Sequence, residues 1–457
     1  MQRHRLMKSG ISILPAVVLA IALGTAGTAA SQVVYSGSAP VYPTDHRHLT
    51  GSLKICDQGS FFVGGVPKLT QYANSITATA GYQELIITQM YVQFQVPQIA
   101  RQVPLVMVHG GGYSGSCLES TPDGHEGWFS HAVRHKLATY VVDQAGRGRS
   151  GWDRSFVNER IATLNFAGFP NLANTSSSGI WTSWFGVIVP AGADIVTGTM
   201  IRHGEPGDPA CVSNPNNCVL PAQMIPPVPN TVDPSIASRV GAIGPAPNPA
   251  NDVYLALQHY KYGVPNTDVT LPSSTCSTCV PTTVNGADTW SARDLATLVE
   301  GLKGGIVATH SQSGSVGHHM VRYLKEDDAA GKCGAAGACL ATLKGLITID
   351  GVCSFAASGT TAADYVHIPY LVVRGWYAPS LSDGDCDATV AAIKAAGGTA
   401  EFIKLNDPKY GTKFQGVTHM MMMSTKSLEV FDEILKWADQ NIKNPIADGS
   451  CGSEGDD

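Results

Sequence analysis

At residues 305–314 the chain reads GIVATHSQSG. The apolar first half of this stretch is typical of a buried strand, and the small residues after it allow a sharp turn into a helix over 313–325. Such a turn lifts a serine hydroxyl above the sheet and places the next backbone N–H beside it. The stretch therefore predicts a nucleophile elbow with Ser311 as the nucleophile.

A second serine competes with Ser311 for this role. The usual elbow has glycine two residues before and two residues after the serine, whereas this chain has Thr309 and Ser313 there. Ser313 is therefore a rival nucleophile. The sequence HSQSG at 310–314 matches the G-H-S-Q-G-G form of the elbow with only small-residue changes, which favours Ser311. Without any chemistry, the same serines would serve as a helix N-cap.

Strand-like and helix-like segments alternate around the elbow. Before it, the apolar run 103–108 enters HGGG at 109–112, and a helix near 127–136 leads to a strand at 138–143. After it, the expected strands and helices are 345–349, 368–373, 386–396, 401–405 and 427–442. This alternation predicts an α/β fold with a mostly parallel central sheet.

Composition divides the chain into four parts. Residues 1–30 have a basic start, an apolar run and small residues at the end, which is the layout of a secretory signal peptide. Residues 31–152 and 286–445 carry the strand and helix alternation, and two β-rich segments early in the first range predict an N-terminal antiparallel hairpin. Residues 153–285 are rich in Pro, Gly and Asn and predict an inserted lid, while 446–457 predict a flexible acidic tail.

Charge and cysteine content limit the partners and the compartment. With 14% charged residues and a formal net charge of −6, nothing favours nucleic acid, and no stretch after the signal is apolar enough to span a membrane. Eleven cysteines in an exported chain predict disulfides, with Cys211/Cys218, Cys276/Cys279 and Cys333/Cys339 as short loop pairs and at least one thiol left free. A metal site is not expected, because the CxxC pair lacks a second Cys or His pair. We expect a secreted or periplasmic protein.

A serine hydroxyl needs a base to remove its proton, so a histidine must come from elsewhere in the chain. In the chain order serine, acid, histidine, the base should follow the last strand, and His419 does. The usual position of the acid, after strand 368–373, has no carboxylate before Asp383. Asp350, which closes the preceding strand, is therefore the predicted acid, with Asp383 or Asp385 in reserve. As a plain turn residue before a glycine, Asp350 would have no chemical role.

The oxyanion of a tetrahedral intermediate needs two converging N–H donors. Gly111 within HGGG and Gln312 after the nucleophile are the predicted pair, since glycine lets the backbone approach a substrate closely. A second glycine-rich stretch, GRGRSG at 146–151, fits a dinucleotide-binding pattern, but no acidic residue stands about 20 residues further on. No phosphate-loop Lys and Ser/Thr follow HGGG either, so no organic cofactor is expected.

These motifs resemble the α/β-hydrolase superfamily through HGGG, DQAGRGRS, HSQSG and the late histidine. More closely, the stretches SFFVGG, TQMYVQFQVPQ, TPDGHEGW and THMMMM are similar to a secreted bacterial esterase of that superfamily that has adjacent cysteines in its oxyanion loop. The resemblance implies Ser311 as nucleophile, His419 as base and Asp350 as acid, where the relative has glutamate. Gly111 and Gly112 stand where the relative has its cysteines, which excludes a disulfide in this loop.

The resemblance also bears on one disulfide near the predicted acid. Cys353 lies three residues after Asp350, and Cys386 begins the helix after the next strand. The relative has cysteines at similar places. We predict a bridge between Cys353 and Cys386 that holds the loop of the acid at the edge of the sheet.

The sequence thus predicts a secreted serine esterase that hydrolyses small-molecule carboxylic esters through an acyl-enzyme, without metal or cofactor. Two other interpretations remain open: lactone or amide hydrolysis by the same residues, and a binding protein of the same fold that has lost turnover. In the expected lid, the aromatic cluster Trp181, Trp184 and Phe185 would either form an apolar wall of the substrate pocket or anchor the lid to the core, with equal weight.

Overall fold

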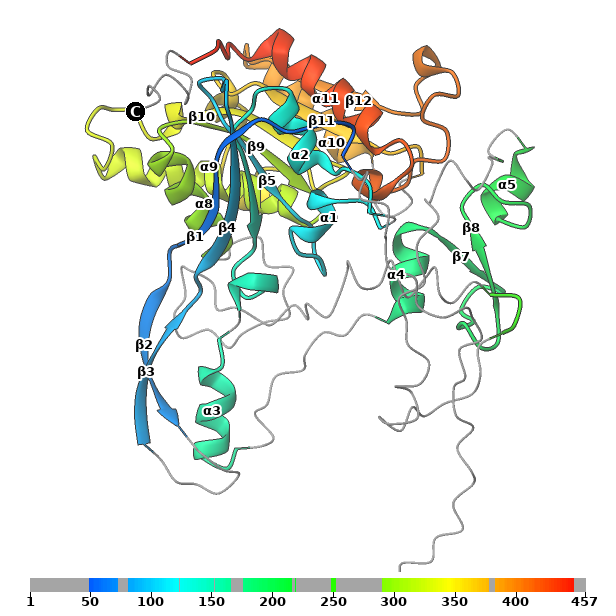
Figure 1. Cartoon of the computed structure of the whole chain (residues 1–457), viewed down its shortest axis with the longest axis horizontal. Helices are drawn as coiled ribbons and strands as arrows, with labels where there is room; N and C mark the ends of the chain where they lie inside the picture. The colour runs from blue at the N-terminus through cyan, green and yellow to red at the C-terminus, as the bar shows by residue number, and fades with distance from the viewer. Residues whose placement is uncertain are drawn as a thin grey trace, which may run out of the picture.

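The computed structural model describes residues 49–72, 81–122, 124–151, 153–165, 176–215, 218, 248–251, 290–377 and 383–447. Its main element is an eight-stranded sheet with the order β1-β4-β6-β5-β9-β10-β11-β12 (Figure 1). In sequence, these strands are β1 Ile55–Val63, β4 Met90–Pro97, β5 Leu105–Val108, β6 Thr139–Asp143, β9 Gly305–His310, β10 Leu343–Ile349, β11 Tyr370–Arg374 and β12 Ala400–Lys404. In the sheet order from β6 to β12, every neighbouring pair of strands is parallel. Strand β4 runs antiparallel to both of its neighbours, β1 and β6. The predicted α/β sheet is therefore confirmed.

The predicted N-terminal hairpin is also confirmed, and its strands extend beyond the edge of the main sheet. Beyond β1 and β4 it continues as a second antiparallel pair, β2 Val66–Tyr72 and β3 Gly81–Ile87. The backbone bends between the two pairs at Gly64, Gly65 and Thr88, all of which have positive φ. Figure 1 shows β2 and β3 projecting away from the sheet beside helix α3, Ser155–Ala162.

Helices cover both faces of the sheet, and two separate cores lie between them and the strands. On one face are α8 Trp290–Gly301, α9 Ser313–Ala329 and α10 Asp383–Ala395, and on the other are α2 Trp128–Arg134 and α11 Ser427–Asn441. In β5, Val106 and Val108 pack into the first core while Leu105 and Met107 pack into the second. Burial on both faces explains why β5, a central parallel strand, is apolar at every position.

The remaining elements are short. They are the helices α1 Ser116–Glu119, α4 Ser177–Trp184 and α5 Pro209–Ser213, the strands β7 Gly186–Val189 and β8 Thr199–Arg202, and 3-10 turns at 148–150, 340–342, 356–358, 362–365, 408–410 and 421–423. The predicted signal peptide, most of the predicted lid and most of the tail lie outside the described residues. Within the described ranges, no helix has the length and apolarity that a membrane crossing requires.

Three disulfides join described cysteines. Cys211–Cys218 and Cys333–Cys339 confirm two predicted loop pairs, while Cys276 and Cys279 lie outside the described residues. Cys353–Cys386 confirms the predicted bridge beside Asp350. Cys117 is buried with a free thiol.

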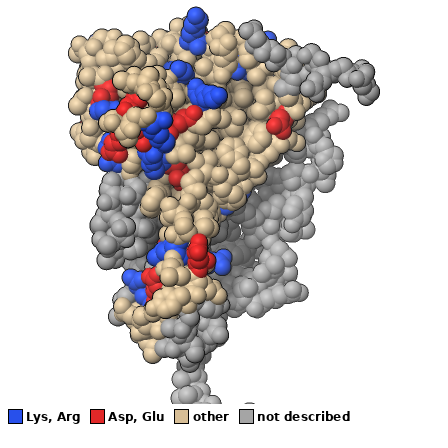
Figure 2. All heavy atoms as spheres, turned by 90° about the vertical axis from the view of Figure 1, so that its left-hand side faces the viewer, with Lys and Arg blue, Asp and Glu red and all other residues tan. Residues whose placement is uncertain are grey.

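Charged side chains of both signs stand next to one another on the face drawn in Figure 2. Ion pairs between charged side chains also connect neighbouring elements: Arg293 of α8 binds Asp327 of α9 at 2.8 Å, and Lys332 binds Asp327 at 3.1 Å. The pair between Arg293 and Asp327 joins α8 to α9, two of the helices that lie on the same face of the sheet.

Candidate active site

Ser311 lies between β9 and α9 in a left-handed backbone conformation, with a φ of 56°. A non-glycine residue in this region is strained and persists only where its surroundings hold it. Here the Ser311 N–H donates to the carbonyl of Ile349 at 3.0 Å, and the Ser311 carbonyl accepts from the N–H of Val352 at 3.1 Å. A Cβ added at Gly351 would lie 2.8 Å from the Ser311 oxygen, so this glycine lets the two turns approach. This strand, turn and helix have the backbone geometry that the predicted nucleophile elbow requires.

The rival serine, Ser313, is engaged in the support of this turn. Its side chain is fully buried, and its Oγ accepts the N–H of His310 at 2.8 Å. The same hydroxyl lies within donating distance of the carbonyls of Val108, at 3.1 Å, and His310, at 2.8 Å. Ser313 therefore links β5 to the elbow, whereas Ser311 is half-buried at the tip of the turn.

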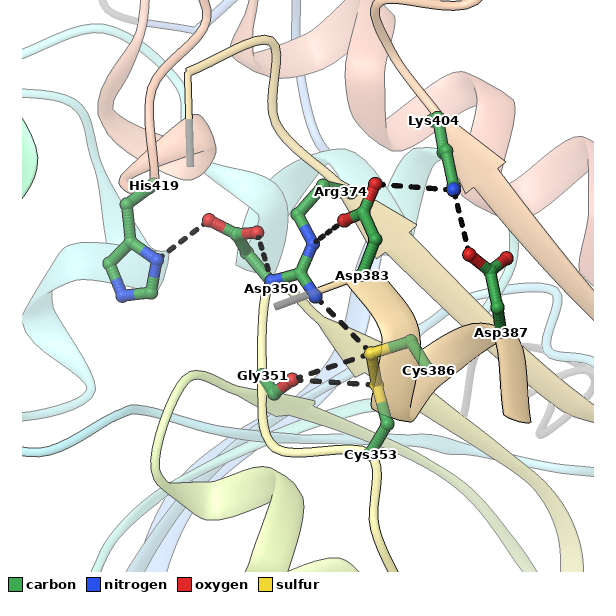
Figure 3. A network of polar contacts seen from close by, with 9 residues as sticks. All are labelled: Asp350, Gly351, Cys353, Arg374, Asp383, Cys386, Asp387, Lys404 and His419. Carbon is green, nitrogen blue, oxygen red and sulfur yellow. Dashed lines mark hydrogen bonds and ion pairs between the residues drawn. A yellow bond between two sulfur atoms is a disulfide. The ribbon is translucent and has the colours of Figure 1, made fainter. Parts of the chain in front are cut away.

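Asp350 and His419 form a buried pair, with 2.7 Å between Asp350 Oδ2 and His419 Nδ1 (Figure 3). Asp350 follows β10 directly and has a φ of 41°, and His419 lies in the loop between β12 and α11. Burial alone would raise the pKa of Asp350, but the neighbouring His419 and the Arg374 guanidinium lower it below the ordinary value. Asp350 is thus held as a carboxylate that accepts from the imidazole.

Arg374 is a member of this site that the sequence did not reveal. In the parallel register Ile349 stands opposite Val373, so the residues that follow, Asp350 and Arg374, lie side by side. Arg374 donates from one terminal nitrogen to Asp350 Oδ1 at 3.0 Å and from Nε to Asp383 Oδ1 at 3.1 Å. The sequence drew attention to this position only because a carboxylate was expected there and was missing.

The two reserve acids lie elsewhere on α10. Asp383 bonds to Arg374 and to Lys404, each at 3.1 Å, and its side chain is 45% exposed. Asp385 is exposed to solvent. Figure 3 shows Asp350 between His419 and Arg374, with Asp383 on the far side of the guanidinium.

His310 brings the loop of His419 to the elbow. Its Nε2–H donates to the carbonyl of His419 at 3.0 Å, and the two rings lie 4.7 Å apart. Complete burial, with a smaller contribution from His419, lowers the pKa of His310 to about 3, so the ring is neutral. Ser311 follows His310 directly, so the predicted nucleophile, base and acid come from adjacent segments at one edge of the sheet.

The HGGG loop packs directly against the elbow. A Cβ added at Gly110 would lie 2.7 Å from the Cβ of Ser311, so only glycine fits there. Gly111, the predicted oxyanion donor, follows it and is half-buried. Gln312, the other predicted donor, occupies the N-cap position of α9.

Two side chains of the 143–150 stretch bind both of these loops. Gln144 Nε2 donates to the carbonyl of His109 at 2.6 Å and to Gln312 Oε1 at 3.2 Å. A terminal nitrogen of Arg147 donates to the carbonyl of Gly110 at 3.2 Å and to Gln312 Oε1 at 3.4 Å. The glycine-rich pattern here thus fixes the predicted oxyanion loop relative to the elbow.

The aromatic cluster of α4 divides into two kinds. Trp181 and Phe185 are each 2% exposed and belong to the core that contains α2 and α11. Trp184 is partly buried and stacks on the ring of His419, with centroids 6.0 Å apart and planes at 14°. It also packs against Tyr113, just after HGGG, at 4.9 Å.

No family model matches the chain. A curated protein, the probable secreted lipase phiG of Fungal sp., is 41% identical over 64 residues, which are 14% of this chain and 18% of that protein. The chain therefore matches less than a fifth of the length of this relative.

Among solved structures, a novel bacterial esterase is similar with a TM-score of 0.57 and 24% sequence identity, covering 89% of this chain and 99% of that chain. At this sequence identity the similarity supports a shared fold but does not assign an activity to this chain. It agrees with the mostly parallel eight-stranded sheet. The chain has the α/β-hydrolase fold.

Proposed function

We propose that this chain is a serine esterase with Ser311 as nucleophile, His419 as base and Asp350 as acid. The observation that carries the proposal is the buried carboxylate and imidazole pair, 2.7 Å apart, at the edge of the sheet where the strained elbow presents Ser311. An ester is the favoured substrate because the similar structure is an esterase and the short sequence match is to a probable lipase. The disulfides support export to an oxidising compartment.

In this mechanism the Ser311 Oγ attacks the ester carbonyl while His419 Nε2 takes its proton. Asp350 accepts from the Nδ1–H of His419, which fixes the tautomer and stabilises the imidazolium. The backbone N–H groups of Gly111 and Gln312 bind the oxyanion. His419 then protonates the leaving alcohol, and a water activated by the same imidazole releases the acid from Ser311.

The test is Ser311→Ala, measured on p-nitrophenyl esters with graded acyl chains. Turnover should fall by roughly 10³ or more, because nucleophile, base and acid act as a unit. A fluorophosphonate probe should label Ser311.

The matched control is Ser315→Ala, which changes a half-buried serine of α9 and should leave turnover unchanged. Ser313→Ala should cost far less turnover than Ser311→Ala but lower the Tm, because the elbow loses its buried hydrogen bonds. Labelling at Ser313, or full activity of Ser311→Ala, would contradict the proposal.

For the substrate pocket we propose different roles for the two tryptophans of α4. Trp184, stacked on His419, forms an apolar wall, so Trp184→Ala should change the preference between short and long acyl chains several-fold. Trp181 anchors the segment, so Trp181→Ala should lower the Tm and leave the chain-length preference unchanged. Specificity constants for both chain lengths, measured beside melting curves, separate the two roles. Equal chain-length profiles for Trp184→Ala and wild type would remove Trp184 from the pocket.

A further inference from the structure

Three metal-ligating side chains converge outside the site described above. His131 lies in α2, His135 follows that helix directly, and Asp432 lies in α11. One ligand atom of each lies within 4.8 Å of the other two. Both imidazoles face the same carboxylate oxygen, with Asp432 Oδ1 at 2.7 Å from His131 Nε2 and 3.5 Å from His135 Nε2.

The two helices hold these groups in place. Histidines four residues apart share one face of a helix, and here the two rings lie 4.8 Å apart. Opposite them, α11 is fixed to α2 by Trp128, which stacks on Phe431 at 4.7 Å and donates from its indole nitrogen to the carbonyl of Ser427 at 2.9 Å. Asp432 directly follows Phe431 in the sequence, so this contact sets the position of its carboxylate.

We propose that His131, His135 and Asp432 form a binding site for a divalent transition-metal ion such as Zn²⁺. Two imidazole nitrogens and one carboxylate oxygen are ligands that Zn²⁺ prefers. Bonds of about 2.0–2.1 Å in a tetrahedral arrangement place neighbouring ligand atoms about 3.4 Å apart. The distance of 3.5 Å between His135 Nε2 and Asp432 Oδ1 already matches this value. The distance of 2.7 Å between His131 Nε2 and Asp432 Oδ1 would have to increase on metal binding.

The surroundings suit an ion with one exchangeable position. The side chains of His135 and Asp432 are 40% and 51% exposed, so water can complete the coordination. Two further charged side chains act on His135, and they form an ion pair with each other, Arg101 with Asp439.

An ion in this position would bridge α2 and α11, two helices on the same face of the sheet. Because the three ligands converge only in the folded chain, binding would stabilise the native state in proportion to the logarithm of the ion concentration. The role is separate from ester hydrolysis: the site touches none of Ser311, His419 or Asp350, and its test does not depend on activity.

The experiment is calorimetric titration of the metal-stripped full chain with Zn²⁺ at pH 7.5, together with melting curves. Wild type should bind one ion at this site and its Tm should rise with Zn²⁺. His135→Ala and Asp432→Asn should each weaken this binding by about tenfold or more and abolish the rise in Tm. His367→Ala, which removes another exposed histidine, is the matched control and should bind as wild type does. Undetectable binding by wild type at about 100 µM Zn²⁺, or wild-type affinity in both His135→Ala and Asp432→Asn, would overturn the proposal.

Discussion

Asp143 and Asp350 are both fully buried aspartates at the carboxyl ends of strands in the main sheet, but they bind different partners. Asp143 accepts the N–H groups of Gly115 and Arg149 and two side-chain nitrogens of Arg149, so both of its oxygens are occupied by neighbouring structure. Asp350 gives one oxygen to Arg374 and the other to the imidazole of His419.

The pKa of each carboxyl is lowered despite burial, mainly by the arginine at Asp143 and by the histidine at Asp350. Charge state therefore does not distinguish them. Their hydrogen-bond partners distinguish them. Backbone and guanidinium donors bind both oxygens of Asp143, whereas one oxygen of Asp350 binds the imidazole of His419, a group that can change its protonation during a reaction. Mutation of the two aspartates should separate a structural from a chemical role.

The largest expected effect is that of Asp350→Asn, which should lower turnover on p-nitrophenyl esters by about 10³–10⁴, because His419 loses the acceptor that fixes its tautomer. Its Tm should change little, since Arg374 keeps Asp383. Asp143→Asn should show the opposite pattern, with turnover of the folded protein within about tenfold of wild type and a Tm lower by several degrees.

Initial rates and melting curves of both variants provide the measurement, and Asp383→Asn is the matched control with a mild effect on each. A steep loss of turnover in Asp383→Asn with mild loss in Asp350→Asn would move the acid to α10. Similar losses of turnover in Asp143→Asn and Asp350→Asn would end the distinction between the two aspartates.

A smaller effect is expected at the arginines. Arg374→Met should lower turnover by about 30-fold and move the acidic limb of the pH–rate profile to higher pH, because the Asp350–His419 pair takes up a proton more readily once the guanidinium charge beside it is gone. Arg374→Lys keeps the charge and should restore the position of the limb. Arg149→Met, the equivalent change at Asp143, should lower the Tm without moving the limb. An unmoved limb in Arg374→Met would make Arg374 a purely structural partner.

These sites also differ in how well their residues could be predicted from the sequence. The turn at Ser311 was predictable because an apolar strand running into small residues is a local signal, and the position of Asp350 was predictable because it closes a strand. Arg374 was not, since its contact depends on the register of β10 against β11, which no local pattern encodes. The same holds for His131 and Asp432, which lie about 300 residues apart in the chain.

Other features needed the packed structure as well. The sequence gives no reason why Ser313 rather than Ser311 should bind the carbonyl of Val108, because that contact crosses from β9 to β5. Similarly, Trp181 and Trp184 stand three residues apart in one helix, and only the docking of that helix decides which ring enters the core and which meets His419.

A third buried aspartate, Asp294 of α8, extends the comparison because its carboxyl is less well paired. Its Oδ2 has no hydrogen-bond partner among the described residues, and a Cβ added at Gly64 would lie 1.9 Å from its Oδ1, so the turn after β1 packs directly on the carboxyl. Burial raises the pKa of Asp294 from the ordinary 3.8 to about 8, against a smaller opposing effect of Arg293. Asp294 is therefore neutral at the pH where Asp143 and Asp350 are ionised.

This difference predicts a pH dependence of stability with little effect on turnover. Between the ordinary pKa and about 8, the folded state keeps a proton on Asp294 that the unfolded state has lost, so stability falls as the pH rises. Asp294→Asn removes this titration, and its Tm relative to wild type should increase steadily from pH 5 to pH 8. Asp143→Asn is the control: the pKa of Asp143 lies below its ordinary value, so the Tm difference from wild type should stay constant over that range. Melting curves at each pH measure these differences. A Tm difference between Asp294→Asn and wild type that stays constant with pH would mean that Asp294 is ionised in the folded chain, as Asp143 and Asp350 are.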